Sequence, residues 1–254
     1  MKNALITGGS EGIGLAVAQL LAAETGTHIT LVARNEEKLK AAVVTLPEEG
    51  HDHFVADLSQ RQDIDALARR LTSRHYDVLI NNAGVGLYGR FTELPLDDQL
   101  KMMRLNMESV VILSHAFLRQ AKPGDALVNT ASFLGYAPLP GAAAYSATKA
   151  FVAALSETLW WENRKKGIYV LGFSPGITST GFHTTAGASV GRFSKILVQP
   201  VERSARELVR ALRKRSAPQA VGGVTTRVLL ALQRGLTRKT TINMMGTNSP
   251  ISSS

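Results

Sequence analysis

Thr7-Gly8-Gly9-Ser10-Glu11-Gly12-Ile13-Gly14 follows the apolar run Ala4-Leu5-Ile6 and precedes a segment of helical periodicity. The start of a helix has unpaired backbone N–H groups and a partial positive charge, so it can hold a pyrophosphate that comes close enough. The glycines at 8, 12 and 14 leave that approach open. The alternative is a glycine-rich turn without a ligand, and the spacing differs from the GxGxxG fingerprint. We interpret the loop as a candidate dinucleotide-phosphate site.

Short apolar runs alternate with longer amphipathic stretches along the chain. The apolar runs predict strands at 4–7, 29–33, 53–56, 78–80, 126–129 and 169–173. The amphipathic stretches predict helices at 13–24, 64–74, 96–119, 144–165 and 202–215. Repeated βα alternation is typical of a parallel sheet covered by helices. We therefore predict a single-domain α/β protein with a Rossmann-type, doubly wound parallel sheet and helices on both faces, which binds ligands at the carboxyl ends of its strands.

The size and composition fit one domain. The chain has 254 residues and no cysteine, which excludes a thiol nucleophile and Cys-ligated zinc. We predict that residues 1–190 form the dinucleotide-binding and catalytic core, and that residues 191–254 form the substrate-loop end and a basic C-terminal extension of the same domain. No secretory segment or long apolar span is evident, so we expect a cytoplasmic location.

The net charge of +9 is concentrated in the last quarter of the sequence. Residues 1–191 carry 17 Lys and Arg against 18 Asp and Glu, whereas residues 192–254 carry 12 against 2. Such a basic segment can contact phosphates or an anionic membrane. Within it, residues 228–239 combine apolar and basic side chains, so this stretch either lies on a membrane surface or packs its apolar side over a pocket or the core. We favour packing, and we expect no nucleic-acid partner.

Arg34 stands at the end of the second predicted strand, where the adenosine ribose of a dinucleotide is expected. A carboxylate there would bind the 2′-hydroxyl of NAD, whereas an arginine can pair with the 2′-phosphate of NADP. Arg34 could also be a solvated residue that opens the next helix. Because no acid precedes it, we predict NADP(H) in preference to NAD(H).

Tyr145 and Lys149 lie four residues apart in a predicted helix, so their side chains emerge on one face. A neighbouring ammonium favours phenolate and lowers the pKa of a tyrosine, which can then exchange a proton with a substrate oxygen. The same spacing also arises by chance on solvated helices. Ser132, just after the strand at 126–129, strengthens the interpretation because its hydroxyl can position a carbonyl oxygen. A simple turn serine is the alternative for Ser132.

In this order, the motifs resemble those of the short-chain dehydrogenase/reductase family, over roughly residues 3–180. The glycine loop is similar to its TGxxxGxG motif, and Ser132, Tyr145 and Lys149 match its catalytic Ser, Tyr and Lys. The resemblance implies that Asn106 is the fourth catalytic residue. It also implies a cofactor site made of Thr7, Gly8, Ser10, Gly12, Ile13, Gly14, Arg34, Asp57, Leu58, Asn82, Ala83, Gly84, Tyr145, Lys149, Pro175, Gly176, Ile177 and Thr180.

The resemblance implies hydride transfer between NADP(H) and a carbonyl or secondary alcohol. Tyr145 would be the acid/base, Lys149 would lower its pKa, Ser132 would position the carbonyl, and Asn106 would hold a water for proton relay. Glu11 departs from the family, because NADP-preferring members often have a basic residue there. A cofactor-binding regulator that uses the basic segment to hold nucleic acid or a partner is the alternative function, and a methyltransferase is disfavoured by Arg34.

The predicted substrate is an apolar carbonyl or alcohol, and its pocket walls are Leu87, Phe133 and Phe182, with Tyr88, Leu134 and Phe193 as further candidates. We expect no metal, because His51 and His53 beside Asp52 make a poor ligand set. Trp160 and Trp161, on the helix of Lys149, suggest contact with a second subunit, although burial within one chain explains them nearly as well. We expect a homodimer or homotetramer.

Overall fold

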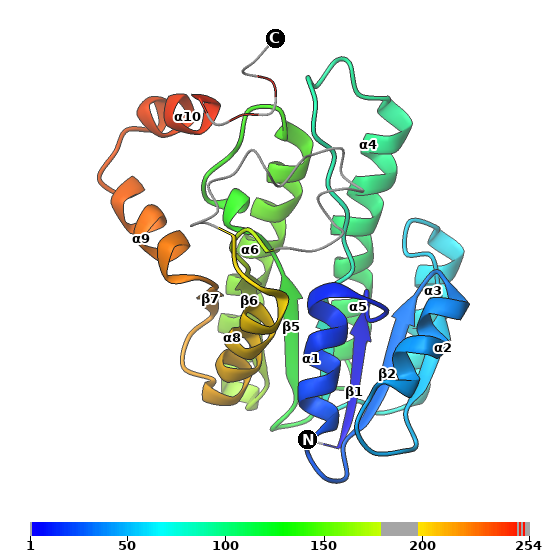
Figure 1. Cartoon of the computed structure of the whole chain (residues 1–254). Helices are drawn as coiled ribbons and strands as arrows, with labels where there is room; N and C mark the ends of the chain where they lie inside the picture. The colour runs from blue at the N-terminus through cyan, green and yellow to red at the C-terminus, as the bar shows by residue number, and fades with distance from the viewer. Residues whose placement is uncertain (1, 179–197, 248, 250, 252–254) are drawn as a thin grey trace.

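The computed structural model describes residues 2–178, 198–247, 249 and 251 and is built on one parallel sheet (Figure 1). The sheet has seven strands in the order β3-β2-β1-β4-β5-β6-β7, and every neighbouring pair is parallel. Its strands are β1 (Asn3–Thr7), β2 (His28–Ala33), β3 (Asp52–Val55), β4 (Val78–Asn81), β5 (Ala126–Thr130), β6 (Tyr169–Ser174) and β7 (Gln219–Val221). The strand order reverses between β1 and β4, and a crevice opens at such a point in doubly wound sheets.

Helices cover both faces of this sheet, which confirms the predicted fold class. The core cluster on one face joins the sheet to α1 (Gly12–Ala22), α2 (Glu36–Val44) and α8 (Val201–Lys214). The cluster on the other face joins it to α3 (Arg61–Ser73), α5 (Ser109–Leu118) and the end of α6 (Ala143–Asn163). Successive residues of β1 serve opposite faces, since Ala4 and Ile6 belong to the first cluster and Leu5 to the second.

The predicted helix at 96–119 is interrupted. It consists of α4 (Leu96–Met103), a π-helical turn (Arg104–Glu108) and α5. A π-helical turn widens the helix by one residue and often lies at a functional site. Asn106 is in this turn and is 1% exposed. Two short 3-10 turns, Phe133–Gly135 and Arg164–Lys166, flank α6.

After α8 the chain adds β7 at the sheet edge and continues into α9 (Val224–Gln233) and α10 (Arg238–Thr247). These two helices lie on the side of the molecule opposite α2 and α3 (Figure 1). Leu230 of α9 and Met245 of α10 pack against an apolar cluster that includes Phe133 and Tyr145. The C-terminal segment therefore packs partly on the core, as expected. Within the described residues, no helix is long and apolar enough to cross a membrane.

Candidate active site

The glycine loop brings the start of α1 to the carboxyl edge of the sheet. Gly8 has a φ of +64°, in the left-handed region that favours glycine. A Cβ on Gly14 would lie 2.2 Å from the carbonyl oxygen of Gly8, far inside van der Waals contact. Because both positions are glycine, the loop closes tightly on α1, and Gly12 and Ile13 at the helix start line an open cleft. This arrangement suits an anion held by backbone N–H groups.

Asn82, just after β4, braces this loop. The Thr7 hydroxyl oxygen accepts hydrogen bonds from the backbone N–H groups of Asn82 and Ala83, both at 3.0 Å. In return, the Asn82 side-chain amide donates to the carbonyl oxygens of Thr7 at 3.1 Å and Gly8 at 3.3 Å. Thr7 is itself buried. Its side chain therefore supports the loop, and Gly8, Asn82 and Ala83 face the cleft.

Arg34 lies after β2 and lines the same cleft as the glycine loop. Lys38, one turn further along in α2, places its Nζ 2.9 Å from Oε2 of Glu11. Both side chains are more than half exposed, so this ion pair contributes little to stability. It does, however, neutralise the carboxylate in the phosphate loop. The sequence reasoning missed Lys38, although its spacing of four residues from Arg34 is visible in the sequence.

Asp57 and Leu58 follow β3 and form part of the cleft wall. The Asp57 Oδ1 accepts hydrogen bonds from the backbone N–H of Ser59 at 3.0 Å and from its hydroxyl at 2.8 Å. The backbone N–H of Asp57 donates to Oδ2 of Asp63 at 2.7 Å. These bonds fix the turn before α3, so the backbone and side chain of Asp57 are held at the edge of the cleft.

Ser132, Tyr145 and Lys149 come together at the other end of the cleft. Ser132 follows β5, and its hydroxyl oxygen accepts a 3.2 Å hydrogen bond from the N–H of Leu134. Tyr145 and Lys149 lie one turn apart on α6, and the Lys149 Nζ is 5.9 Å from the centre of the Tyr145 ring. The Lys149 ammonium donates to the carbonyl oxygen of Thr130 at 2.9 Å.

Burial shifts the pKa values of this pair in opposite directions. Desolvation raises the pKa of the Tyr145 phenol well above its usual range, although a hydrogen bond with Ser132 partly opposes that shift. Desolvation lowers the pKa of the Lys149 ammonium to about 8. At neutral pH the phenol therefore carries its proton, as a general acid must before it donates. The sequence-based expectation that Lys149 lowers the Tyr145 pKa stays a prediction for the state with bound dinucleotide.

Asn106 lies behind this end of the cleft, in the π-helical turn. Its Oδ1 accepts from the N–H of Val85 at 3.0 Å, and its Nδ2 donates to the carbonyl oxygen of Val85 at 2.9 Å and to the Thr148 hydroxyl at 3.1 Å. The Asn106 side chain thus connects the segment after β4 to α6. Its partner on α6, Thr148, lies between Tyr145 and Lys149 in the sequence. The proton-relay role stays a prediction.

The two ends belong to one cleft of about 640 Å³. The structure brings together most of the residues that the sequence predicted. Those that line the cleft are Gly8, Ser10, Gly12, Ile13, Arg34, Asp57, Leu58, Asn82, Ala83, Gly84, Ser132, Tyr145, Lys149, Pro175, Gly176 and Ile177, with Leu87 and Phe133 of the expected substrate wall.

Three of the predicted residues that the structure describes do not line the cleft. Thr7, Gly14 and Asn106 support the cleft from behind and are absent from its lining. Thr180 and Phe182 lie outside the described residues, as does the further candidate Phe193.

The cleft also contains residues that the sequence reasoning missed. Thr178 lines it, and its hydroxyl donates to the Gly176 carbonyl at 3.0 Å and lies 2.9 Å from the Ser204 hydroxyl. Asp98 and Lys101 of α4 reach the same cleft. The ring centre of Tyr88, a weaker candidate in the sequence, is 6.1 Å from that of Tyr145, and burial raises the Tyr88 pKa to about 12. Asp98 and Lys101 reach the cleft only because the tertiary fold places α4 beside it, and no sequence motif predicts this position.

None of the histidines that the structure describes lines this cleft. Both ring nitrogens of His51 bond the backbone, since Nδ1 accepts from the N–H of Ile29 at 3.1 Å and Nε2 is 2.7 Å from the Pro47 carbonyl. His75 lies 3.6 Å from Asp77 and 3.5 Å from Asp125 at the amino ends of β4 and β5. Among the described residues, these three form a group that could hold a cation, at the opposite edge of the sheet.

The fold and the cleft together define a Rossmann-type nucleotide-binding protein with a Ser-Tyr-Lys set at one end. A sequence profile of the short chain dehydrogenase family matches residues 2–190. An uncharacterized oxidoreductase of Staphylococcus aureus (strain USA300) is 31% identical over 183 residues, which cover 70% of this chain and 79% of the relative. The chain belongs to the short-chain dehydrogenase family and is an oxidoreductase of that family.

Solved structures resemble almost the whole chain. A short-chain dehydrogenase from Sphingobium yanoikuyae in complex with NADPH aligns with a TM-score of 0.80 and 29% identity, over 94% of this chain and 97% of that chain. The bulky-bulky ketone specific alcohol dehydrogenase from Comamonas testosteroni aligns with a TM-score of 0.76 and 28% identity, over 94% of this chain and 96% of that chain. The similarity therefore extends to the C-terminal quarter, beyond the family profile.

Proposed function

We propose that this protein is an NADP(H)-dependent oxidoreductase that reduces an apolar carbonyl compound, or oxidises the corresponding secondary alcohol. The observation that carries the proposal is one cleft that has the glycine loop at one end and Ser132, Tyr145 and Lys149 at the other. A dinucleotide is the kind of ligand that needs both ends of such a crevice.

The residues present fit a dinucleotide. The close approach of Gly14 to Gly8 leaves the start of α1 bare of side chains, which suits a pyrophosphate. Asp57 and Leu58 would hold the adenine, Lys149 the nicotinamide ribose, and the segment 175–177 the carboxamide. Thr180 is proposed as a further contact to the carboxamide. When bound, the nicotinamide would supply or accept the hydride.

The protein's own side chains handle the proton. Ser132 donates a hydrogen bond that positions and polarises the substrate oxygen. Tyr145, neutral because it is buried, donates its proton to that oxygen during reduction and takes it back during oxidation. Lys149 stabilises the phenolate that forms, since its ammonium lies on the same helix face. Asn106 holds the Val85 segment and Thr148 in place, and we propose that it also keeps a water aligned to resupply the proton.

Two cations support the preference for NADP(H). Arg34 lines the cleft at the expected ribose position, and Lys38 stands one helical turn away with its charge directed at the loop. An arginine can pair with a phosphate in two-pronged geometry, and a lysine adds a point charge. The Sphingobium relative, similar over nearly its whole length, binds NADPH. Glu11 would otherwise place a negative charge near the bound phosphates. Lys38 reduces this effect, because it forms an ion pair with the Glu11 carboxylate.

The substrate wall is apolar. Leu87, Phe133, Tyr88 and Met102 join Tyr145 in one apolar cluster beside the cleft. Such a wall favours a large hydrocarbon group on the carbonyl carbon over a charged one. The Comamonas relative is a bulky-bulky ketone specific alcohol dehydrogenase, and we propose a bulky, apolar carbonyl as the substrate here.

The test is consumption of NADPH and of NADH with a panel of aliphatic, aromatic, 3-oxoacyl and steroid carbonyls. We expect turnover on apolar members and a kcat/KM at least tenfold higher with NADPH, in line with the binding energy of a charged phosphate pair. Equal rates with NADH would overturn the cofactor preference. No turnover on any carbonyl or alcohol, together with measurable NADPH binding, would overturn the catalytic assignment.

A further inference from the structure

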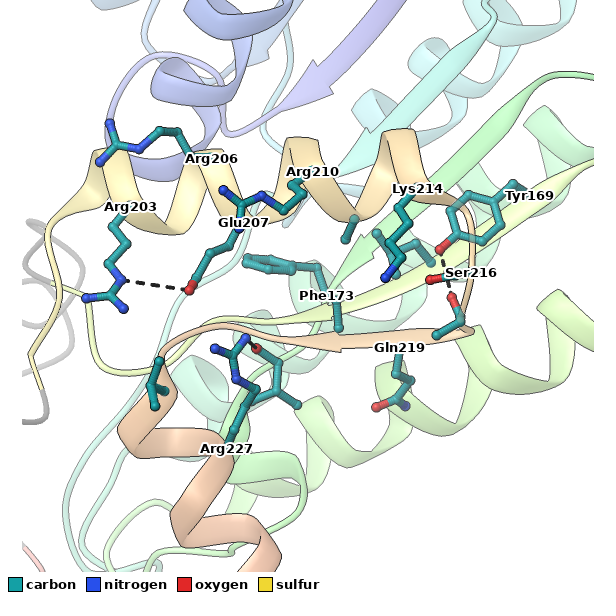
Figure 2. Close-up of a pocket in the computed structure, with 16 residues that line it drawn as sticks. Tyr169, Phe173, Arg203, Arg206, Glu207, Arg210, Lys214, Ser216, Gln219 and Arg227 are labelled. Carbon is teal, nitrogen blue, oxygen red and sulfur yellow. Dashed lines mark hydrogen bonds and ion pairs between the residues drawn. The ribbon is translucent and has the colours of Figure 1, made fainter.

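A second cavity of about 660 Å³ lies between α8, the edge strand β7 and the start of α9. Figure 2 shows Arg203, Arg206, Arg210 and Lys214 along α8, with Arg227 of α9 across from them. We refer to this cavity, with these five cations, as the basic groove. It is separate from the cleft described above, and no step of the proposed reaction uses it.

The positive charge of the basic groove is largely uncompensated. Glu207 is its one acid, and its carboxylate accepts from the N–H of Gly223 at 2.9 Å and lies 3.8 Å from the Arg203 Nε. Within the described part of the chain, Arg206, Arg210, Lys214 and Arg227 form no ion pair. The sequence contains no Asp or Glu after Glu207. Clustered cations without local partners attract a polyanionic surface.

An apolar stripe borders the groove. Val224, Val228 and Leu232 lie four residues apart on α9 and are 51%, 53% and 67% exposed. The four-residue spacing puts them on one side of the helix, and the buried Thr226 and Gln233 lie on the other. Val224 itself lines the groove. The groove and the stripe thus form one continuous surface, cationic on α8 and apolar on α9.

We propose that this surface binds an anionic lipid bilayer, with the basic groove on the headgroup phosphates and the α9 stripe in the interface between headgroups and acyl chains. Cations beside a narrow apolar helix face are the features that hold a helix in the plane of a membrane surface. Each basic residue near an anionic leaflet adds about a fivefold gain in affinity, from roughly 1 kcal/mol of attraction.

Other occupants fit the surface less well. Single-stranded nucleic acid needs exposed aromatic rings for stacking. The two aromatic residues that line the groove, Tyr169 and Phe173, are buried, and residues 198–254 contain no Phe, Tyr or Trp. A second copy of the chain would bring like charges together, because the face carries nearly one sign of charge. A small soluble phosphate would use the groove but leave the α9 stripe without a role.

The location of α9 gives the bilayer contact a consequence for the enzyme. Leu230, on the inner side of α9, packs against the apolar cluster that contains Phe133 and Tyr145. The docked helix would therefore lie between the lipid and the substrate wall. Such a contact would bring an apolar substrate in the membrane close to the cleft. This consequence rests on the proposed function. The lipid contact itself does not depend on that function.

The experiment is flotation of the full chain with vesicles of phosphatidylcholine alone or mixed with phosphatidylglycerol. We expect binding to the anionic vesicles, release at high salt and little binding to the neutral ones. Arg206→Glu with Arg210→Glu should weaken binding at least tenfold, because it replaces two attractions with two repulsions. Val228→Asp should also weaken it, because it places a charge in the stripe.

Matched variants away from this surface separate its effect from that of net charge. Arg69→Glu with Arg119→Glu changes the charge equally, and Val44→Asp alters an equally helical, exposed valine; both should bind like the natural chain. Tyr145→Phe should bind vesicles normally even if it is inactive, so failure of the proposed function stays distinguishable. Equal loss in the matched variants, preference for single-stranded DNA, binding of inorganic phosphate without vesicle binding, or no binding at all would each overturn the proposal.

Discussion

Tyr145 is the residue on which the proposed chemistry depends most directly. Tyr145→Phe removes only the hydroxyl, so the ring stays packed against Tyr88 and the cleft keeps its shape. Turnover should fall by at least about 10³-fold, near the upper range for loss of a general acid. The dissociation constant for NADPH should change less than about threefold. Stopped-flow turnover and fluorescence titration on the same preparation measure the two effects, and retained activity would refute the assignment.

Lys149 should make stability depend on pH. Its folded pKa of about 8 lies below its ordinary value of 10.5, so between these values the unfolded chain binds more protons and stability rises with pH. Tyr145 has a raised pKa and acts in the opposite direction only above about pH 10.

Lys149→Met keeps a linear side chain but has no titrating group. From pH 7.5 to pH 9.5, the natural chain should gain about 1–2 kcal/mol in unfolding free energy relative to this variant. The loss of the hydrogen bond to Thr130 lowers the unfolding free energy of the variant by the same amount at every pH. The change of unfolding free energy with pH is therefore the quantity to compare. Urea unfolding at each pH measures it, and parallel pH profiles would show that Lys149 is not the titrating group.

Arg34 and Glu11 should affect cofactor choice in opposite directions. Arg34→Ala removes the cation at the expected 2′-phosphate, so the NADPH dissociation constant should rise about 10- to 100-fold with little change for NADH. Glu11→Gln releases Lys38 from its 2.9 Å ion pair, and NADPH should bind a few-fold more tightly. Isothermal titration with both cofactors tests this. If Arg34→Ala weakened NADH binding as much as NADPH binding, Arg34 would support the loop and would not bind the 2′-phosphate.

The catalytic residues could be predicted from the sequence because each lies in a short motif. The roles of residues that support the cleft from behind, such as Thr7, were harder to predict. Ser132, Tyr145 and Lys149 could be identified from spacing on one strand end and one helix face, and the structure gathers them in one cleft. The role of Thr7 as an acceptor for two N–H groups depends on how β1 and β4 pair. No local pattern reveals such a contact between segments about 75 residues apart.

At the level of elements, the loop between β1 and α1 gives the clearest test of packing. Gly14→Ala places a methyl group 2.2 Å from the Gly8 carbonyl, so either the loop or α1 must move. We expect a loss of about 2 kcal/mol in unfolding free energy and no measurable NADPH binding. Gly246→Ala is the matched control, since its new Cβ would meet its nearest neighbour at 3.6 Å in a helix. The control should be neutral or slightly stabilising. Normal cofactor binding by Gly14→Ala would contradict the proposed loop.

The sequence did not predict the helices α2, α9 and α10, the edge strand β7 or the π-helical turn. Physical reasons explain the last two. β7 has only three residues and pairs on one side, so it needs no long apolar run. The π-helical turn shifts the register by one residue within an otherwise helical pattern, and periodicity alone reads 96–119 as one helix. Buried central strands such as β4 and β5 were predictable, because continuous apolar runs are typical of parallel sheets covered on both faces.

For the molecule as a whole, two of the exposed apolar surfaces differ in the charge that surrounds them. The basic groove and the α9 stripe carry nearly one sign of charge. A second apolar line contains Leu96, Leu100 and Met103 of α4 and Val111 of α5, which are 65%, 48%, 39% and 40% exposed. Charges of both signs accompany this second line, for example Asp98 and Lys101 at 3.7 Å.

The mixed charge of the α4–α5 line suits contact with a second copy of the chain, since an isologous interface must be complementary to itself. Trp161 of α6 is exposed but already stacked by Arg164, so it is a weaker candidate. We therefore predict a homodimer through α4 and α5. Leu100→Asp with Val111→Asp should give a monomer by size-exclusion chromatography with light scattering, because two like charges would be buried at the contact. Val44→Asp, on exposed α2, should leave the dimer intact. If the unaltered chain is monomeric, or if both variants dissociate equally, then the α4–α5 line is not the subunit contact.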